Sequence, residues 1–229
     1  MKYILIGLGN FGLSMAKKLT AAGQEVIAVD SRMNKVELIK EEVAYSVCLD
    51  ATDEAAMRSL PLREADVVIV TIGEDPGANI MATALLKNQG VKRLVSRAIN
   101  PLHEQVLKAI GVDEIVHPEE EAADRWTKKL CLSGVVNSFE LGEQHSIVEV
   151  KVPAAYAGKS LEEIGFRNKH NLLVLTTIRQ KQERHLIGGM RAVTDVQGLI
   201  SPKTTFEAGE TMVIYGANKD IQQLLRMDD

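Results

Sequence analysis

Cysteine is scarce in this sequence. Its only two copies, Cys48 and Cys131, lie in different parts of the chain. They lack the close spacing of a metal site, and a single distant pair makes no disulfide framework. We therefore expect a protein of a reducing compartment, because disulfide-stapled folds belong to oxidising ones.

Long apolar runs and basic tracts are also missing. No segment approaches the roughly 20 apolar residues that a membrane helix needs, and the N-terminus lacks the basic flank and cleavage site of a signal peptide. We expect a cytoplasmic protein without membrane insertion. The net charge is −4, which without a basic tract argues against nucleic acid as a partner. The 229 residues suffice for one large domain or two modest ones.

The first thirty residues carry the pattern of a dinucleotide-binding unit. An apolar run over residues 2–6 predicts a strand, a glycine-rich turn follows, and residues 13–22 have helical spacing. A second apolar run over 25–29 ends at Asp30. Strand, glycine turn, helix, strand and acid in this register predict the first half of a Rossmann fold.

Each glycine of the turn has a physical reason to be there. Gly7 permits the tight turn, Gly9 lets the backbone approach a pyrophosphate, and Gly12 lets the helix pack closely on the strand. Phosphates would then meet free N–H groups at the positive end of the helix dipole. The alternative is a Rossmann-like domain that has kept the turn but binds nothing.

Asp30 occupies the position at which an acid binds the ribose in this kind of fold. At the carboxyl end of a strand it would accept hydrogen bonds from both ribose hydroxyls. Its charge would repel a 2′-phosphate, which disfavours NADP. Arg32 lies two residues further on and weakens that last argument.

Further short apolar runs alternate with helical patterns. Strands are predicted over residues 45–49, 65–72, 93–96 and 113–116, and helices over 34–42, from about 53, 77–88 and 101–110. In the helix over 77–88, we expect Ile80, Met81, Ala84 and Leu85 to face the sheet. Six strands alternating with helices predict an α/β fold, a Rossmann-like doubly wound parallel sheet over residues 1–117.

The segment Asp50-Ala51-Thr52-Asp53 follows the third strand. Small and polar groups at the carboxyl end of a strand are typical of ligand sites in open α/β sheets. Alternatively, Asp50 or Thr52 simply caps the helix that begins near Asp53.

The alternation of strands and helices breaks at His117. A long amphipathic helix is predicted from 118 to about 132, and its apolar face includes Ala122, Ala123, Trp126, Leu130 and Cys131. We expect this face to be an intersubunit surface. The three glutamates of its first turn complement the helix dipole.

A second crossover helix is predicted over 135–141. Beyond it, strands over 145–152, 172–178, 186–187 and 211–215 and a helix over 219–225 predict a smaller α+β lobe. The predicted domains are therefore 1–117, 118–141 and 142–229.

Several of these motifs together resemble one known family. They are the glycine turn, Asp30, the segment from Asp50 to Asp53, the strand ending in Ile72-Gly73, and Gly-Val-Asp-Glu-Ile-Val-His-Pro-Glu over 111–119. In this combination the chain resembles the regulatory subunits of Trk/Ktr potassium-uptake systems. Those are RCK proteins with an N-terminal nucleotide-binding lobe and a C-terminal TrkA-C lobe.

The resemblance implies a nucleotide site, position by position. Phosphates, ribose, adenine and their surroundings would be contacted by Gly7, Gly9, Asn10, Phe11, Gly12, Asp30, Ser31, Arg32, Asp50, Ala51, Thr52, Ile72, Gly73 and Arg97. Glu119 matches a carboxylate that some relatives place at the dimer interface to bind a divalent or monovalent cation. Alternatively, Glu119 only complements the helix dipole, as the other glutamates of the first turn do.

Asn10 departs from the family pattern. ATP-responsive Ktr subunits often carry arginine between the second and third glycines, where it reaches the terminal phosphate bound by the neighbouring subunit. Asparagine cannot neutralise charge, so ATP, ADP, AMP and NAD(H) all remain candidate ligands.

The function that the resemblance implies is regulatory rather than enzymatic. The chain would be a cytoplasmic homodimer, assembled further into a ring of eight subunits, that docks on an integral membrane cation-transport subunit and gates it when nucleotide binds. One alternative is an NAD-dependent oxidoreductase, but no convincing acid or base stands out among His103, His117, His145, His170 and His185. Another alternative is a regulator that binds cyclic di-AMP through the C-terminal lobe, near residues 163–167 and Asn171.

Overall fold

The computed structural model describes residues 1–131, 134–184 and 190–226. The chain divides into two compact units, Met1–Glu121 and Ala122–Asp229. Within the described residues, no helix is both long and apolar enough to span a membrane.

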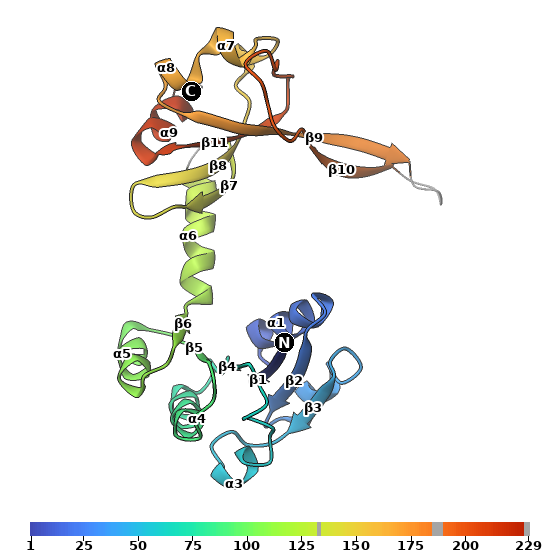
Figure 1. Ribbon diagram of the computed structural model, residues 1–229, viewed down its shortest axis with the longest axis vertical. Coiled ribbons are helices and arrows are strands. Elements are labelled where there is room, and N and C mark those ends of the chain that lie inside the picture. The colour runs from blue at the N-terminus through green and yellow to red at the C-terminus, as the bar shows by residue number, and fades with distance from the viewer. Residues whose placement is uncertain (132–133, 185–189, 227–229) are drawn as a thin grey trace. The chain divides into compact units, whose positions relative to one another are not determined.

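The first unit contains a parallel sheet of six strands in the order β3-β2-β1-β4-β5-β6 (Figure 1). The strands are β1 (Lys2–Ile6), β2 (Glu25–Asp30), β3 (Tyr45–Cys48), β4 (Val67–Val70), β5 (Leu94–Arg97) and β6 (Glu114–Val116). The chain moves outward from β1 in both directions, so the order reverses between β1 and β4. This confirms the predicted doubly wound sheet.

Helices connect these strands, and the N-termini of several are capped by a side chain. They are α1 (Asn10–Ala21), α2 (Met33–Glu37), α3 (Glu54–Met57), α4 (Pro76–Asn88), α5 (Pro101–Ile110) and α6 (Pro118–Cys131), which continues into the second unit. Asp53 caps α3, Asp75 caps α4 and Asn100 caps α5, each by accepting from first-turn N–H groups. Pro76 and Pro101 fill first-turn positions where no N–H is needed.

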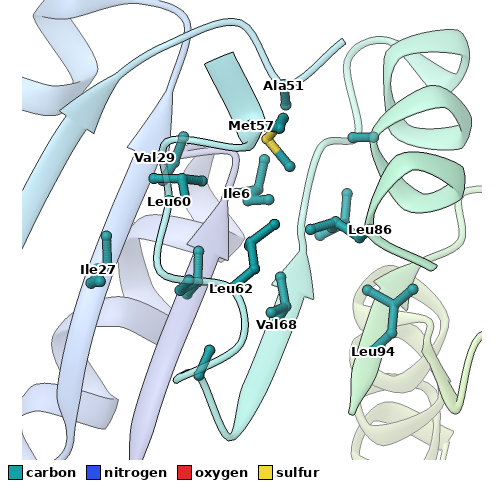
Figure 2. Close-up of a cluster of buried hydrophobic side chains, with 14 residues drawn as sticks. Ile6, Ile27, Val29, Ala51, Met57, Leu60, Leu62, Val68, Leu86 and Leu94 are labelled. Carbon is teal, nitrogen blue, oxygen red and sulfur yellow. The ribbon is translucent and has the colours of Figure 1, made fainter. Parts of the chain in front are cut away.

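Both faces of the parallel sheet are buried. On one face, Ile6 and Val68 of the sheet pack with Met57 of α3 and Leu86 of α4 (Figure 2). On the other face, strand residues pack with Ala16 of α1 and with residues of the α2 segment. Burial on both faces explains why the strands are continuous apolar runs rather than alternating ones.

The predicted inner face of α4 is wrong. Its buried residues are Asn79, Ala82, Thr83 and Leu86, and Met81 is 53% exposed. The Asn79 amide donates to the Ile72 carbonyl over 2.9 Å, and its carbonyl oxygen accepts from the Ser96 hydroxyl over 3.1 Å. Because the polar side chains are paired, the helix buries them and leaves Met81 outside.

The second unit is built on an antiparallel sheet of five strands in the order β10-β9-β11-β8-β7 (Figure 1). Its elements are β7 (Val135–Glu140), β8 (His145–Lys151), η1 (Ala154–Tyr156), α7 (Leu161–Ile164), α8 (Phe166–Lys169), β9 (Leu173–Arg184), β10 (Met190–Val196), β11 (Thr211–Ala217) and α9 (Asn218–Leu225). Phe166, Phe206 and Met212 lie in its core. The expected smaller α+β lobe is confirmed.

The predicted helix over 135–141 is wrong. These residues form β7, which pairs antiparallel with β8 at the edge of the sheet. Val135, Val136 and Phe139 favour strand over helix, and pairing with β8 satisfies the backbone of β7. The predicted strand over 186–187 lies outside the described residues, and β10 was not predicted.

Candidate functional site: a cavity at the switch point of the sheet

A cavity of about 630 Å³ lies at the carboxyl ends of the parallel strands, where β1 and β4 are neighbours. Open α/β sheets bind ligands at this switch point. Of the residues predicted for the site, the cavity is lined by Gly7, Gly9, Asn10, Phe11, Asp30, Ser31, Arg32, Asp50, Ala51, Thr52, Ile72, Gly73, Arg97 and Glu119. Gly12 alone is absent from the lining, because it lies beneath the turn. The sequence prediction missed the lining residues Ile6, Leu49, Thr71, Glu74, Asp75 and Ala78.

A residue at the end of β4 anchors the glycine turn. Gly7 has φ +101°, a region that L side chains rarely adopt. The Thr71 hydroxyl, buried at the end of β4, donates to the Gly7 carbonyl over 2.6 Å. A Cβ on Gly12 would overlap that carbonyl and lie 2.5 Å from Thr71 Oγ1. Gly12 therefore keeps α1 against the turn.

The N-terminus of α1 differs from those of α3, α4 and α5. It begins at Gly9 with no side-chain cap and no acidic residue in its first turn. A Cβ on Gly9 would meet no atom within 4 Å, so the backbone there faces open space in the cavity. First-turn N–H groups with no internal acceptor are suited to a phosphate.

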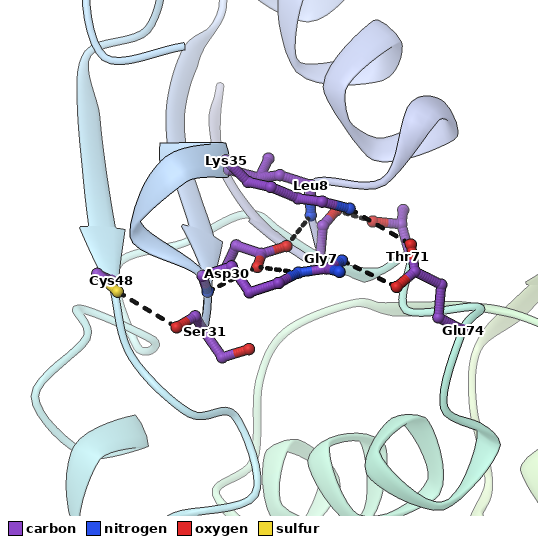
Figure 3. A network of polar contacts seen from close by, with 9 residues as sticks. Gly7, Leu8, Asp30, Ser31, Lys35, Cys48, Thr71 and Glu74 are labelled. Atoms are coloured by element: carbon purple, nitrogen blue, oxygen red, sulfur yellow. Dashed lines mark hydrogen bonds and ion pairs between the residues drawn. The ribbon is translucent and has the colours of Figure 1, made fainter. Parts of the chain in front are cut away.

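Asp30 is held at the end of β2 by backbone donors. Leu8 N–H donates to one carboxylate oxygen over 2.7 Å, and Arg32 N–H donates to the other over 2.9 Å (Figure 3). The residue is 8% exposed. A carboxylate has about four lone-pair sites, so Asp30 keeps acceptor capacity for ribose hydroxyls.

The loop after β3 forms its own hydrogen bonds. Asp50 Oδ1 accepts from the Thr52 N–H over 2.9 Å and from its hydroxyl over 2.8 Å. These bonds hold the pKa of Asp50 below its ordinary value. The helix cap is Asp53, so the alternative in which Asp50 or Thr52 caps α3 is wrong.

Arg97 reaches the cavity from the end of β5. Its guanidinium carbon lies 6.0 Å from the centre of the Phe11 ring, and a Cβ on Gly73 would clash with the guanidinium. Arg97 pairs with Glu119 in the first turn of α6, while its Nε is buried without a hydrogen-bond partner. An arginine with an unused buried donor is suited to bind an anion.

Glu119 is therefore engaged by Arg97 within one chain. In the described ranges, no three His, Cys, Asp or Glu side chains cluster in a way that could hold a metal ion. Cation binding at Glu119 stays a prediction, and the remaining ligands would have to come from a second copy or from the nucleotide.

A second ion-pair cluster joins the loop after β4 to the loop after β2 and to α2. Glu74, in the loop after β4, bonds Arg32 over 3.0 Å and Lys35 over 3.4 Å. Figure 3 shows Lys35 extending over Gly7 toward Glu74. The two cations hold the pKa of Glu74 below its ordinary value, with Lys35 the larger cause.

No histidine is among the residues that line the cavity. His103 is buried without a partner for either ring nitrogen, and this burial lowers its pKa. His117 lies 3.8 Å from Glu104, His145 stacks on Tyr215, and His170 bonds the Tyr156 hydroxyl. His185 lies outside the described residues.

The segment 163–167, predicted for cyclic di-AMP, spans the end of α7 and the start of α8. Ile164 and Phe166 belong to the core, and Glu163 closes a capping box with Ser160. Asn171 donates to Asp220 over 2.9 Å. Arg167 is exposed.

A comparison with known families decides what this chain is related to. The family model of the TrkA-N domain matches residues 3–118, the part that contains the cavity. The chain belongs to the TrkA-N family. The predicted resemblance is thereby confirmed.

Relatives and solved structures extend this likeness beyond the TrkA-N domain. The Ktr system potassium uptake protein C of Bacillus subtilis is 38% identical over 79% of this chain and 82% of the relative. Protein A of the same system and organism is 30% identical over 97% of this chain and 94% of the relative. The GsuK RCK domain has a TM-score of 0.63 at 15% identity, over 99% of this chain and 47% of that one. The GsuK channel bound to NAD gives the same TM-score and identity, over 98% and 39%.

Proposed function

We propose that this TrkA-N protein binds an adenine nucleotide in the switch-point cavity and regulates a membrane cation transporter, without turning the nucleotide over. The observation that carries the proposal is the arrangement of the cavity. An uncapped helix N-terminus, an acid at the end of β2 and an arginine at the end of β5 all line one space.

Each part of a nucleotide has a matching group in this cavity. Phosphates would accept from the first-turn N–H groups of α1 and from Arg97. The ribose hydroxyls would donate to Asp30, and the adenine would lie beside Ala51 and Thr52. NAD(H), ADP, AMP and ATP share these groups, and the GsuK channel of the same fold is bound to NAD.

In this mechanism, α6 responds to nucleotide binding in the cavity. Arg97 lines the cavity and also pairs with Glu119 in the first turn of α6. A phosphate that binds Arg97 competes with Glu119 for it, so the ligand discriminates between two states of this ion pair. Only such unequal binding lets a ligand shift a conformational equilibrium.

Two relatives are named potassium uptake proteins, which supports a potassium transporter as the membrane partner. The proposed location is the cytoplasmic face of the membrane. Potassium flux through the reconstituted membrane subunit, with and without this chain, tests the role. Flux that responds to nucleotide only when the chain is present supports it, and flux that ignores both contradicts it.

The oxidoreductase alternative has no histidine, lysine, tyrosine or cysteine among the lining residues of the described cavity to act as its acid or base. The carboxylates of Glu74, Asp75 and Glu119 are already bonded to Arg32, the Ala78 N–H and Arg97, respectively. Cofactor oxidation or reduction in the presence of candidate hydroxy or amino acids would favour the enzyme. Binding without turnover favours the regulator.

Asn10 leads to a prediction about ATP. It is exposed at the first turn of α1 and lines the cavity. We expect the wild type to bind ATP and ADP with similar affinity, and Asn10→Arg to prefer ATP about tenfold or more. A charge-assisted hydrogen bond of roughly 1.5–3 kcal/mol gives a change of this size. Calorimetric titration measures both, with Asn10→Gln as the uncharged control. A wild type that already prefers ATP tenfold would contradict it.

The apolar face of α6 leads to a prediction about assembly. Trp126 is 52% and Leu130 77% exposed in the single chain, an arrangement typical of an interface. We expect sedimentation of a dimer or larger ring at micromolar concentration, and a smaller species for Trp126→Glu. Leu199→Glu, at a fully exposed position of the same unit, is the control. A wild type that sediments as a monomer would contradict this.

A further inference from the structure

Two features of this site favour opposite forms of the ribose, one with free hydroxyls and one with a 2′-phosphate. Asp30 is the acid that favours free ribose hydroxyls and repels a 2′-phosphate. Arg32 and Lys35 follow it directly in the loop and in α2, and an arginine near this acid is the residue that accommodates a 2′-phosphate. From these residues alone, the site could select either NAD or NADP.

Glu74 is ion-paired with both of these cations. Its two carboxylate oxygens are divided between the two cations: Oε2 lies 3.0 Å from Arg32 Nη2, and Oε1 lies 3.4 Å from Lys35 Nζ. Arg32 Nε is also 3.6 Å from Asp30 Oδ1. Arg32, beside the ribose acid, and Lys35, which is not among the lining residues of the cavity, are therefore both already paired with carboxylates.

Glu74 belongs to a different part of the sheet from the cations that it binds. It follows β4, whereas Arg32 and Lys35 follow β2, so the ion pairs cross the switch point (Figure 3). A glutamate carboxylate is charged at neutral pH, and Lys35 and Arg32 hold the pKa of Glu74 below its ordinary value. The charge that a 2′-phosphate would carry is thus supplied by the protein itself.

We propose that Glu74 is a specificity determinant of the nucleotide site, which rejects 2′-phosphorylated ligands by occupying Arg32 and Lys35. This inference rests on the proposed function, because it assigns a role within the same cavity. A 2′-phosphate would meet two carboxylates, Asp30 and Glu74, and both cations that these residues bind, Arg32 and Lys35, are already paired. Without the charge of Glu74, the two cations become a phosphate subsite.

The test compares NAD⁺ with NADP⁺ by calorimetric titration of the full chain. The wild type is expected to bind NADP⁺ at least tenfold more weakly than NAD⁺. In Glu74→Gln, the affinity for NADP⁺ relative to NAD⁺ is expected to rise about tenfold or more, since charge-assisted bonds to phosphate replace the internal pairs. Adding Arg32→Ala to Glu74→Gln should remove most of that rise.

Glu64→Gln is the matched control. It removes the same charge from the same unit, at a residue that pairs with Lys2 and does not line the cavity. An unchanged NADP⁺ to NAD⁺ ratio in Glu74→Gln, or an equal change in Glu64→Gln, overturns the assignment while NAD⁺ binding preserves the proposed function. If neither the wild type nor any variant binds NAD⁺ or NADP⁺, the assignment of Glu74 is overturned, and the proposed function is overturned only if ADP, AMP and ATP also fail to bind.

Discussion

Asp30→Ala is expected to abolish stabilisation of the protein by nucleotide. In the wild type, a ligand at a hundredfold its Kd adds about 2.7 kcal/mol to the free energy of unfolding. Asp30 supplies the ribose acceptor and fixes Leu8 N–H and Arg32 N–H beside the cavity. Its loss removes ribose binding and loosens the turn that binds phosphate. Thermal unfolding with and without NAD⁺, ADP and AMP measures the effect.

Asp66→Ala controls for the loss of a backbone acceptor. Asp66 accepts from Lys2 N–H over 2.9 Å at the opposite ends of the strands, and it does not line the cavity. This variant should keep the full nucleotide-dependent shift even if its own stability falls. A full ligand shift in Asp30→Ala would show that Asp30 is no ribose acceptor.

Gly12→Ala is expected to destabilise the first unit strongly. Its Cβ would overlap the Gly7 carbonyl and crowd Thr71 Oγ1 at 2.5 Å. Backbone and a buried hydroxyl cannot yield as a flexible side chain does, so α1 must move off the turn. Overpacking of this kind typically costs about 1–3 kcal/mol and occasionally more. The midpoint of urea unfolding, read with a probe in the first unit, measures it.

Gly9→Ala is the matched variant in the same turn. Gly9 has φ −67° and ψ −178°, which alanine adopts readily, and its Cβ would meet open space. We expect near-wild-type stability with weaker nucleotide binding, because the methyl group projects where the phosphates would lie. Equal stability of Gly12→Ala and Gly9→Ala would contradict the packing argument.

The parallel sheet was predictable because local and tertiary signals agree there. Strands such as β4 are buried on both faces and read as continuous apolar runs. Glycine and acid stand at their carboxyl ends, where the order of strands reverses. The cavity lining followed from these positions, since the ends of adjacent parallel strands converge.

The prediction failed where tertiary pairing overrode local pattern. β7 was read as a helix although Val135, Val136 and Phe139 favour a strand, and its pairing with β8 is what the sequence does not show. The inner face of α4 was missed because Asn79 and Thr83 are buried through bonds to groups distant in sequence. Hydrophobic spacing contains no information about such partners.

Glu74 and Thr71 were missed for a related reason. Both stand at the end of the predicted fourth strand, and this position could have identified them as site residues. The carbonyl that Thr71 bonds belongs to Gly7, after β1, and the cations that Glu74 bonds lie after β2, in the loop and in α2. Only the fold brings them together.

The central claim is that the switch-point cavity binds an adenine nucleotide. Calorimetric titration of the wild-type chain with NAD⁺, NADH, ADP, AMP and ATP tests it most directly. The account predicts saturable binding of at least one of these ligands, with one site per chain, and its loss in Asp30→Ala. Absence of saturable binding for all five, in a chain shown to be folded, would contradict it.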